Sequence, residues 1–281
     1  MIRLQDISFT YRHGRRPAVE TASAEIGPGL HLLLGENGAG KTTLLHIIDG
    51  LLHPQQGQAV VDGRDVWPRN PGLQRLMFYL ADTLDLPFRN LDETVRCHAP
   101  FYPNFSRETL DECLAAWSLD SKTPFKSMSL GIRRKAQLSY AIALHTDFLL
   151  LDEPANGLDI NSRKELRRLI AKNMTDEQTV IVSTHTVNDF EALFDGIIFM
   201  TGSRLLFSMP VWEISRRLRF AVAAAPSPEA IYQEPDGAVF RAVMLPDGSE
   251  SPVDLRLLYS AIMSPARDRI LKLLANDGTI Q

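Results

Sequence analysis

Residues 35–42 read Gly35-Glu36-Asn37-Gly38-Ala39-Gly40-Lys41-Thr42, which is the complete G-x-x-x-x-G-K-[ST] spacing of a phosphate-binding loop. The apolar residues 30–34 precede this loop and predict a buried strand. After the loop, apolar side chains recur at helical spacing between residues 44 and 51 and predict an amphipathic helix. The motif therefore lies between a strand and a helix, which is the context that a phosphate-binding loop requires.

The glycines and the helix start together predict a concave anion site. Gly35, Gly38 and Gly40 allow tight turns that aim successive backbone N–H groups inward, and the helix start adds a partial positive charge. We expect Lys41 to reach the terminal phosphates of a nucleotide and the Thr42 hydroxyl to bind Mg²⁺. Nucleotide contacts are expected from Gly35, Asn37, Gly38, Ala39, Gly40, Lys41, Thr42 and Thr43.

The bulk composition is that of an ordinary folded protein. The chain of 281 residues predicts about two domains and suffices for a sizeable core. Its net charge of -4 gives no support for nucleic-acid binding. Cys97 and Cys113 lack the spacing of a metal site, which favours unreactive thiols in a reducing compartment. No apolar stretch approaches the roughly 18 residues of a transmembrane helix, so we expect any work at a membrane to be done from outside the lipid.

Strand and helix patterns alternate along most of the chain. Residues 148–151 and 179–183 predict strands, and the amphipathic segment 162–173 between them predicts a helix. This order implies parallel strands joined by a crossover. The expected fold is an α/β P-loop NTPase core with an antiparallel β subdomain, interrupted by a helical insertion over about residues 88–144. Further strands are expected at residues 2–11, 18–26, 58–61 and 76–80.

A small α+β extension is expected over residues 206–281, after a core domain that ends at residue 205. Turns rich in Pro and Gly separate short apolar runs in this part of the chain. Pro265 is expected to break the last helical stretch into two helices. The predicted elements are a helix at 211–219, an apolar run at 220–225, a strand at 238–245, and helices at 254–263 and 266–275.

Two adjacent carboxylates, Asp152 and Glu153, end the apolar strand at residues 148–151. Neighbouring carboxylates at a strand end can divide the chemistry of phosphate hydrolysis between them. Asp152 is expected to bind Mg²⁺, and Glu153 to polarise the attacking water. The alternative interpretation is a solvated acidic turn.

Five motifs occur in order along residues 1–205, and with them the chain resembles the ATPase subunit of an ABC transporter. The resemblance is specific because all five occur in the right sequence and at plausible spacings. Residues 206–281 lie outside it. The motifs are the loop at 35–42, Ser129-Leu130-Gly131, Leu151-Asp152-Glu153-Pro154, Gly157-Leu158-Asp159 and Ser183-Thr184-His185.

The resemblance implies a head-to-tail dimer with two ATP molecules between the phosphate-binding loop of one subunit and the signature segment of the other. Ser129 and Gly131 open a predicted helix, where free N–H groups and the Ser129 hydroxyl would form a second anion site for the γ-phosphate. Asp159 resembles the residue that reaches across the dimer, with a helix cap as the alternative role. The signature Met128-Ser129-Leu130-Gly131-Ile132 departs from the commoner Leu-Ser-Gly-Gly-Gln and resembles that of bacterial ABC-2-type exporters.

Three further residues take roles from the resemblance. His185 would hold the attacking water against Glu153 and bind the γ-phosphate, so that Glu153, His185 and Lys41 are the expected catalytic residues. Tyr11 fits the aromatic residue that stacks on adenine, with a core aromatic as the alternative. Asp82 stands where the family usually has Gln, and we expect it to bind Mg²⁺, with a turn cap as the alternative.

The basic residues Arg133, Arg134 and Lys135 crowd the start of the helix that follows the signature. Cations are disfavoured at a helix N-terminus by about 0.3 to 1 kcal/mol each. A polyanion facing these side chains would reverse that cost, so we expect them to face the nucleotide of the partner subunit. The alternative is that all three point to water.

These observations favour an ATP-binding and ATP-hydrolysing subunit that powers an ABC transporter, with export preferred over import. We expect ATP and Mg²⁺ as cofactors, transmembrane permease subunits as partners, and a homodimer or a heterodimer with a related ATPase. The expected location is peripheral, at the cytoplasmic face of the cell membrane. The alternatives are a soluble ABC ATPase that does not transport and a regulatory ATP-binding module without turnover.

Overall fold

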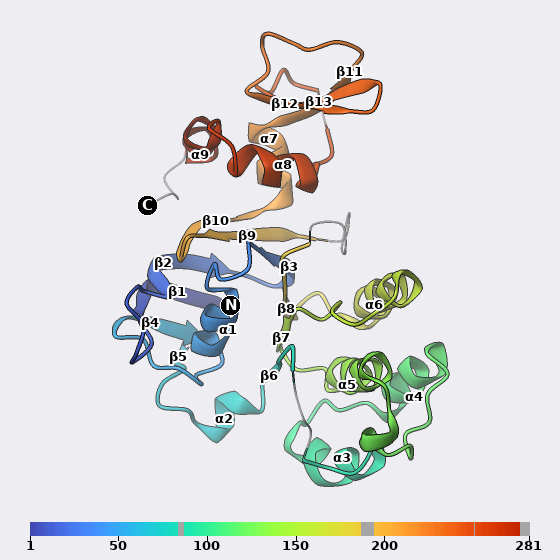
Figure 1. Ribbon diagram of the computed structural model, residues 1–281. Coiled ribbons are helices and arrows are strands. Elements are labelled where there is room, and N and C mark those ends of the chain that lie inside the picture. Colours follow the sequence, from blue (N-terminus) through green and yellow to red (C-terminus); the bar gives the residue numbers. More distant parts are fainter. Residues whose placement is uncertain (84–86, 187–193, 250, 276–281) are drawn as a thin grey trace.

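The computed structural model describes residues 1–83, 87–186, 194–249 and 251–275 (Figure 1). Within these residues, ten strands form one sheet in the order β5-β4-β1-β2-β10-β9-β3-β8-β7-β6. A second sheet of three strands, β11-β13-β12, lies at the far end of the C-terminal part. The large sheet carries helices on both faces, which is the α/β architecture that the sequence predicts.

The half of the large sheet that carries the phosphate-binding loop is parallel. Strand β3 pairs with β8 and β9, and β7 pairs with β8 and β6, all in parallel register. Strands β7 and β8 are buried at every residue, because helices cover both faces. The carboxyl ends of β3, β7 and β8 meet at one edge of the sheet. The bounds are β3 Gly29–Leu34, β6 Met77–Leu80, β7 Phe148–Asp152, β8 Thr179–Thr184 and β9 Gly196–Thr201.

The other half is the predicted antiparallel β subdomain. Strand β1 pairs antiparallel with both β2 and β4, and β4 continues antiparallel into β5. Strand β10 (Arg204–Pro210) joins the two halves, because it pairs antiparallel with β9 and parallel with β2. The bounds are β1 Ile2–Phe9, β2 Val19–Ile26, β4 Gln56–Val61 and β5 Arg64–Asp65.

Helices α3, α4 and α5 form the predicted helical insertion between β6 and β7. Together with α6 they pack on one face of the parallel strands, whereas α1 lies on the other face (Figure 1). The caps follow the usual chemistry, since Asn90, Ser106 and Ser129 accept hydrogen bonds from the first turns of α3, α4 and α5. The bounds are α1 Lys41–Ile48, α2 Pro71–Gln74, α3 Leu91–His98, α4 Arg107–Ala116, α5 Leu130–Ala143 and α6 Ile160–Asn173, with 3-10 turns at Ala99–Phe101 and Phe125–Ser127.

The C-terminal extension is α+β, but it begins later than predicted. The boundary at residue 205 falls inside β10, which belongs to the large sheet. The extension also shares an apolar core with that sheet, because Leu32 and Phe199 cluster with Leu258 and other side chains of α8. Strand β12 was not predicted from the sequence. It contains Pro235, which is tolerated because β12 is an edge strand. The bounds are α7 Val211–Arg217, β11 Arg219–Ala223, β12 Tyr232–Asp236, β13 Val239–Met244, α8 Leu255–Ile262 and α9 Arg267–Ala275.

None of the helices in the described ranges has the length and apolar character needed to cross a bilayer.

Candidate functional site

The phosphate-binding loop follows β3 and leads into α1, as the sequence predicts. A Cβ added at Gly35 would lie 2.3 Å from the carbonyl oxygen of Met200, and one at Gly40 would lie 2.2 Å from that of Ala18. Gly40 also has a φ of +100°, which L side chains rarely adopt. It is the N-cap of α1 and offers no side-chain hydrogen bond. The first N–H groups of α1 are therefore left for an anion.

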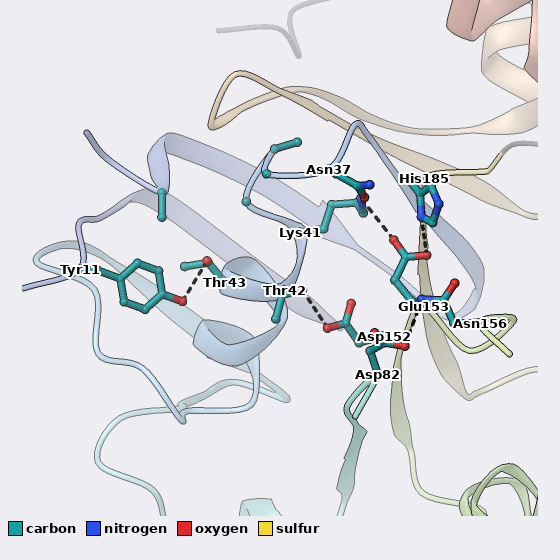
Figure 2. A pocket seen from close by; sticks show the side chains of 14 residues that line it. Tyr11, Asn37, Lys41, Thr42, Thr43, Asp82, Asp152, Glu153, Asn156 and His185 are labelled. Carbon is teal, nitrogen blue, oxygen red and sulfur yellow. Dashed lines mark hydrogen bonds and ion pairs between the residues drawn. The ribbon is translucent and has the colours of Figure 1, made fainter. Parts of the chain in front are cut away.

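The ammonium group of Lys41 is held inside the loop. Its Nζ donates to the carbonyl oxygens of Gly35 at 2.8 Å and Glu36 at 3.3 Å. It also lies 3.4 Å from Oε1 of Glu153, and the Lys41 side chain is 6% exposed. A positive charge is thus fixed between the loop and the carboxylate of Glu153, which follows β7 (Figure 2).

Asp152 is buried and oriented by hydroxyl groups, so the alternative of a solvated acidic turn is wrong. The residue is 2% exposed. Its Oδ2 accepts hydrogen bonds from the Thr42 hydroxyl at 2.8 Å and the Tyr79 hydroxyl at 3.1 Å. Ser183 donates to its Oδ1. Burial and the neighbouring Asp152 raise the pKa of Tyr79, which keeps its hydroxyl protonated as a donor.

The donor set formed by Thr42 and Asp152 fits Mg²⁺. Both offer oxygen, and Mg²⁺ is usually bound by one or two carboxylates together with phosphate oxygens. In the part of the chain that the structure describes, no group of three or more His, Cys, Asp or Glu side chains could hold a metal by itself. A metal at this site would therefore depend on the phosphates of a nucleotide for its remaining ligands.

Glu153 lies between a lysine and a histidine. Its Oε2 is 2.9 Å from Nδ1 of His185, while its Oε1 faces Lys41 (Figure 2). The backbone of Glu153 has a φ of +45°, a conformation rarely found outside glycine and typical of functional sites. Its N–H donates to the Ser183 hydroxyl at 2.9 Å, which helps to hold this conformation. The carboxylate is thus aimed at the space above the loop.

A cavity of about 560 Å³ lies beside the phosphate-binding loop and is lined by Lys41, Asp152, Glu153 and His185 among others. Tyr11 stands at one end, 45% exposed, with its hydroxyl 3.1 Å from Oγ1 of Thr43, so the alternative of a core aromatic is wrong. Asp82 also lines the cavity, where its Oδ1 accepts a hydrogen bond from Nδ2 of Asn156 at 3.0 Å. The structure brings together these predicted residues: Tyr11, Asn37, Gly38, Ala39, Gly40, Lys41, Thr42, Thr43, Asp82, Asp152, Glu153 and His185.

Ser129, Gly131 and Asp159 do not line this cavity. Ser129 caps α5 and accepts a hydrogen bond from the N–H of Ile132 at 3.3 Å. Asp159 caps α6 through the N–H of Ser162 at 2.9 Å, so its alternative capping role is confirmed. That hydrogen bond holds the pKa of Asp159 below its usual value. The predicted approach of Asp159 to a second subunit stays a prediction.

The signature and the Asp159 loop form one continuous surface. A Cβ on Gly131 would lie 2.8 Å from the carbonyl oxygen of Gly157, so the two segments touch through their backbones. Large apolar side chains beside them face outward, with Leu130 72% and Ile160 74% exposed. We call the surface formed by residues 129–132 and 157–160 the signature surface.

Arg134 does not point toward a partner's nucleotide, and for this residue both the polyanion hypothesis and the alternative of water exposure are wrong. It is 3% exposed. Its guanidinium donates to the carbonyl oxygens of Ala81 at 2.6 Å, Asp152 at 2.7 Å and Glu153 at 3.1 Å. These carbonyls lie where β6 and β7 end and need donors, which explains the inward orientation. Burial lowers the pKa of Arg134, and the nearby carboxylates oppose that shift.

Three residues of the site were not predicted from the sequence: Tyr79, Ser183 and Asn156. Tyr79 is the one polar side chain of β6, and that interruption was the available signal. Ser183 belongs to the recognised motif Ser183-Thr184-His185, in which only His185 was given a role. Asn156 follows Glu153 by three residues and gave no pattern of its own.

Comparisons with known proteins agree with this geometry. A family model described as "ABC transporter" matches residues 20–156. An ABC transporter ATP-binding protein of Methanosarcina acetivorans is 31% identical over 219 residues, which cover 73% of this chain and 76% of the relative. The chain belongs to the family of ABC transporter ATP-binding proteins. It is accordingly an ATP-binding subunit and an ATPase, and the predicted family and fold are confirmed.

Other ABC proteins are similar over comparable lengths. The bacitracin transport ATP-binding protein BcrA of Bacillus licheniformis is 27% identical, with coverage of 77% of this chain and 72% of the relative. A dimeric post-hydrolysis ATP-binding cassette bound to ADP and Pi has the same fold, with a TM-score of 0.64 and 22% identity over 75% of this chain and 98% of that chain. A cobalt transport ATP-binding protein has a TM-score of 0.66 at 22% identity, and this match covers 96% of our chain and 100% of the other.

Proposed function

We propose that this ABC ATPase hydrolyses ATP with Mg²⁺ to power an ABC-2-type exporter, as a dimer bound to separate transmembrane permease subunits at the cytoplasmic face of the membrane. The observation that carries the catalytic part is the position of Glu153, whose carboxylate contacts both Lys41 and His185 beside the phosphate-binding loop. This is the arrangement needed to activate and orient a water molecule next to a bound phosphate.

Each residue of the cavity has a role in this proposal. Glu153 accepts a proton from the attacking water, and His185 holds that water and the carboxylate in position. Lys41 and the N–H groups at the start of α1 bind the β- and γ-phosphates. Thr42 and Asp152 would hold Mg²⁺, with Asp82 lining the same cavity, and a bound metal would neutralise charge on the phosphate oxygens. Tyr11 provides the surface on which the adenine ring stacks.

The dimer is proposed because the nucleotide cavity lacks Ser129, Gly131 and Asp159, which lie on the signature surface instead. In a head-to-tail pair, the signature surface of one subunit would close the cavity of the other. Its exposed Leu130 and Ile160 would then be covered. Nucleotide binding that favours the closed pair supplies the free energy for the change that is passed to the permease.

Export is proposed from the short signature at residues 128–132 and from the C-terminal extension. The transport function named for BcrA is compatible with this direction.

Co-purification from detergent-solubilised membranes tests the membrane part of the proposal. A multi-spanning protein in stoichiometric amount is the expected result, and isolation of the ATPase alone under all mild detergents would contradict it.

Replacement of Glu153 by Gln tests the catalytic part. Loss of the general base is expected to lower ATP turnover by about 10² to 10⁴ fold while ATP binding persists. The variant should also form a stable dimer with ATP, measured by size exclusion with light scattering. Glu108→Gln, at an exposed position of α4, is the matched control. Equal turnover in Glu153→Gln and wild type would support a different base or the regulatory ATP-binding module.

A further inference from the structure

Two adjoining cavities lie in the C-terminal extension, between α7 and the chain that joins β13 to α8. The first measures about 860 Å³ and the second about 520 Å³. Ser215, Ser251 and Pro252 line both, so the two cavities adjoin. None of their described lining residues also lines the nucleotide cavity. Both volumes fall in the range of about 300 to 1,000 Å³ that is typical of small-molecule sites.

The first cavity carries a positive charge that no described carboxylate neutralises. Arg216 is the one charged side chain among the described residues that line it. Its guanidinium lies over the ring of Trp212, 5.8 Å from the ring centroid. Neighbouring arginines differ, because Arg219 pairs with Asp247 at 3.3 Å and Arg241 pairs with two carboxylates. Among the described residues, the charge of Arg216 therefore has no carboxylate partner and can pair with an anion.

Trp212 and Ser251 give this cavity two further binding groups. Trp212 is 58% exposed, which is unusual for the largest aromatic side chain, and it offers a flat apolar surface beside the Arg216 charge. The hydroxyl oxygen of Ser251 accepts a hydrogen bond from the N–H of Phe220 at 2.9 Å. Its own hydrogen is then free to be donated to a ligand in either cavity.

The second cavity is more apolar than the first, and the charged side chains that the structure describes in it balance each other. Val211, Val253 and Leu255 contribute aliphatic surface. Its two charged residues, Arg241 and Asp254, pair with each other at 2.8 Å. Burial of an apolar group here would gain about 25 cal/mol per Å² of surface removed from water. The second cavity therefore suits the uncharged part of a ligand whose charged group lies near Arg216.

We propose that the extension binds an amphipathic organic anion across these two cavities. The carboxylate, sulfonate or phosphate of the ligand pairs with Arg216 and accepts the Ser251 hydrogen, its ring or chain lies on Trp212, and its apolar end enters the cavity lined by Val211 and Val253. This binding site is separate from the nucleotide cavity and does not depend on ATP turnover.

Two dyes that differ by one charged group provide the test. The full chain is titrated with 8-anilinonaphthalene-1-sulfonate and with its uncharged analogue N-phenyl-1-naphthylamine, with excess Mg-ADP present to fill the nucleotide cavity. We expect Arg216→Gln to weaken binding of the sulfonate about tenfold, because a charge-assisted hydrogen bond is lost. Affinity for the uncharged dye should stay within about twofold. Transfer of excitation from tryptophan to the bound sulfonate should fall in Trp212→Phe.

Matched variants distinguish dye binding at this site from nonspecific dye binding elsewhere on the protein. Arg256→Gln removes an exposed arginine of α8 in the same extension, and it should leave both affinities unchanged. Val253→Asp places a carboxylate in the apolar cavity and should weaken both dyes. Thermal melting confirms that each variant is folded. Equal binding of the sulfonate by wild type and Arg216→Gln, or undiminished excitation transfer in Trp212→Phe, would overturn the proposal.

Discussion

Arg134 in α5 donates a hydrogen bond from Nη2 to the backbone carbonyl oxygen of Asp152, at 2.7 Å. The same guanidinium reaches the carbonyl oxygens of Glu153 and Ala81. One buried cation thus connects the helix that starts at the signature with the strand end that carries both carboxylates of the site. Because Glu153 has a φ of +45°, these contacts also help to keep its backbone in a rarely populated conformation.

Replacement of Arg134 by Met should lower both stability and ATP turnover. The variant keeps an unbranched side chain but leaves buried carbonyl groups without donors, at a cost of about 1 to 3 kcal/mol. Urea unfolding measures the stability, and steady-state hydrolysis measures kcat and KM. We expect kcat to fall more than KM rises, because Arg134 positions Glu153 and does not line the nucleotide cavity. Arg96→Met, whose side chain is 76% exposed on α3, serves as the control.

A loss of stability in Arg134→Met no larger than that in Arg96→Met would show that the carbonyl contacts of Arg134 contribute nothing measurable to stability. A normal kcat in a destabilised variant would limit Arg134 to a role in folding.

The sequence predicted the core of the site well because the motifs are local. The spacing of residues 35–42 determines both the loop and the place of Lys41 at the start of α1, and the two carboxylates follow directly from the end of an apolar strand. The order of strand, helix and strand likewise predicted the parallel sheet. Such features can be predicted because they depend only on residues that are close together in the chain.

Contacts between residues on different strands could not be predicted from the sequence. The hydrogen bond from Tyr79 to Asp152 depends on the register of β6 and β7, which pairs Leu80 with Leu151. Arg134 looked like a surface cation because its charge was considered without the carbonyls that it would meet. The predicted domain boundary at residue 205 falls inside β10 for the same reason, because no local sequence pattern shows that β10 pairs with β9 and β2.

Tyr79→Phe should lower the affinity of the site for Mg²⁺. The Tyr79 hydroxyl orients Oδ2 of Asp152, and loss of such a partner behind a metal ligand typically costs about 10- to 100-fold in metal affinity. We expect the Mg²⁺ concentration for half-maximal turnover to rise by about tenfold, with little change at saturating metal. Tyr102→Phe, which removes the hydroxyl of another partly buried tyrosine, is the control. Identical Mg²⁺ titrations for Tyr79→Phe and wild type would contradict the role.

Asp49 should make the fold less stable as the pH rises. Burial raises the pKa of Asp49 to about 6, although Arg69 opposes this shift from 3.2 Å. The folded chain therefore holds this proton more tightly than the unfolded chain, whose Asp pKa is about 3.9. The stabilisation is fully present below about pH 4 and is lost as the pH rises through about 6. The shift corresponds to about 3 kcal/mol.

Urea unfolding between about pH 4 and pH 8 checks this expectation. Asp49→Asn should remove the dependence, so that the variant gains stability relative to wild type as the pH increases. Asp176→Asn, at an exposed position, accounts for the loss of a carboxylate as such. A constant difference between wild type and Asp49→Asn across the whole pH range would show that Asp49 titrates normally.

Gly131→Ala should weaken the ATP-bound dimer without affecting nucleotide binding by one subunit. The new Cβ would lie 2.8 Å from the carbonyl oxygen of Gly157, so the signature surface must shift. Such overpacking costs about 1 to 3 kcal/mol. In the Glu153→Gln background, we expect the ATP-dependent dimer to dissociate at about tenfold higher protein concentration, measured by light scattering. Gly27→Ala is the control, because its Cβ would meet no atom within 4 Å. Since Gly131 does not line the nucleotide cavity, monomer affinity for ATP should match that of the parent. A dimer unaffected by Gly131→Ala would mean that two subunits meet through some other face.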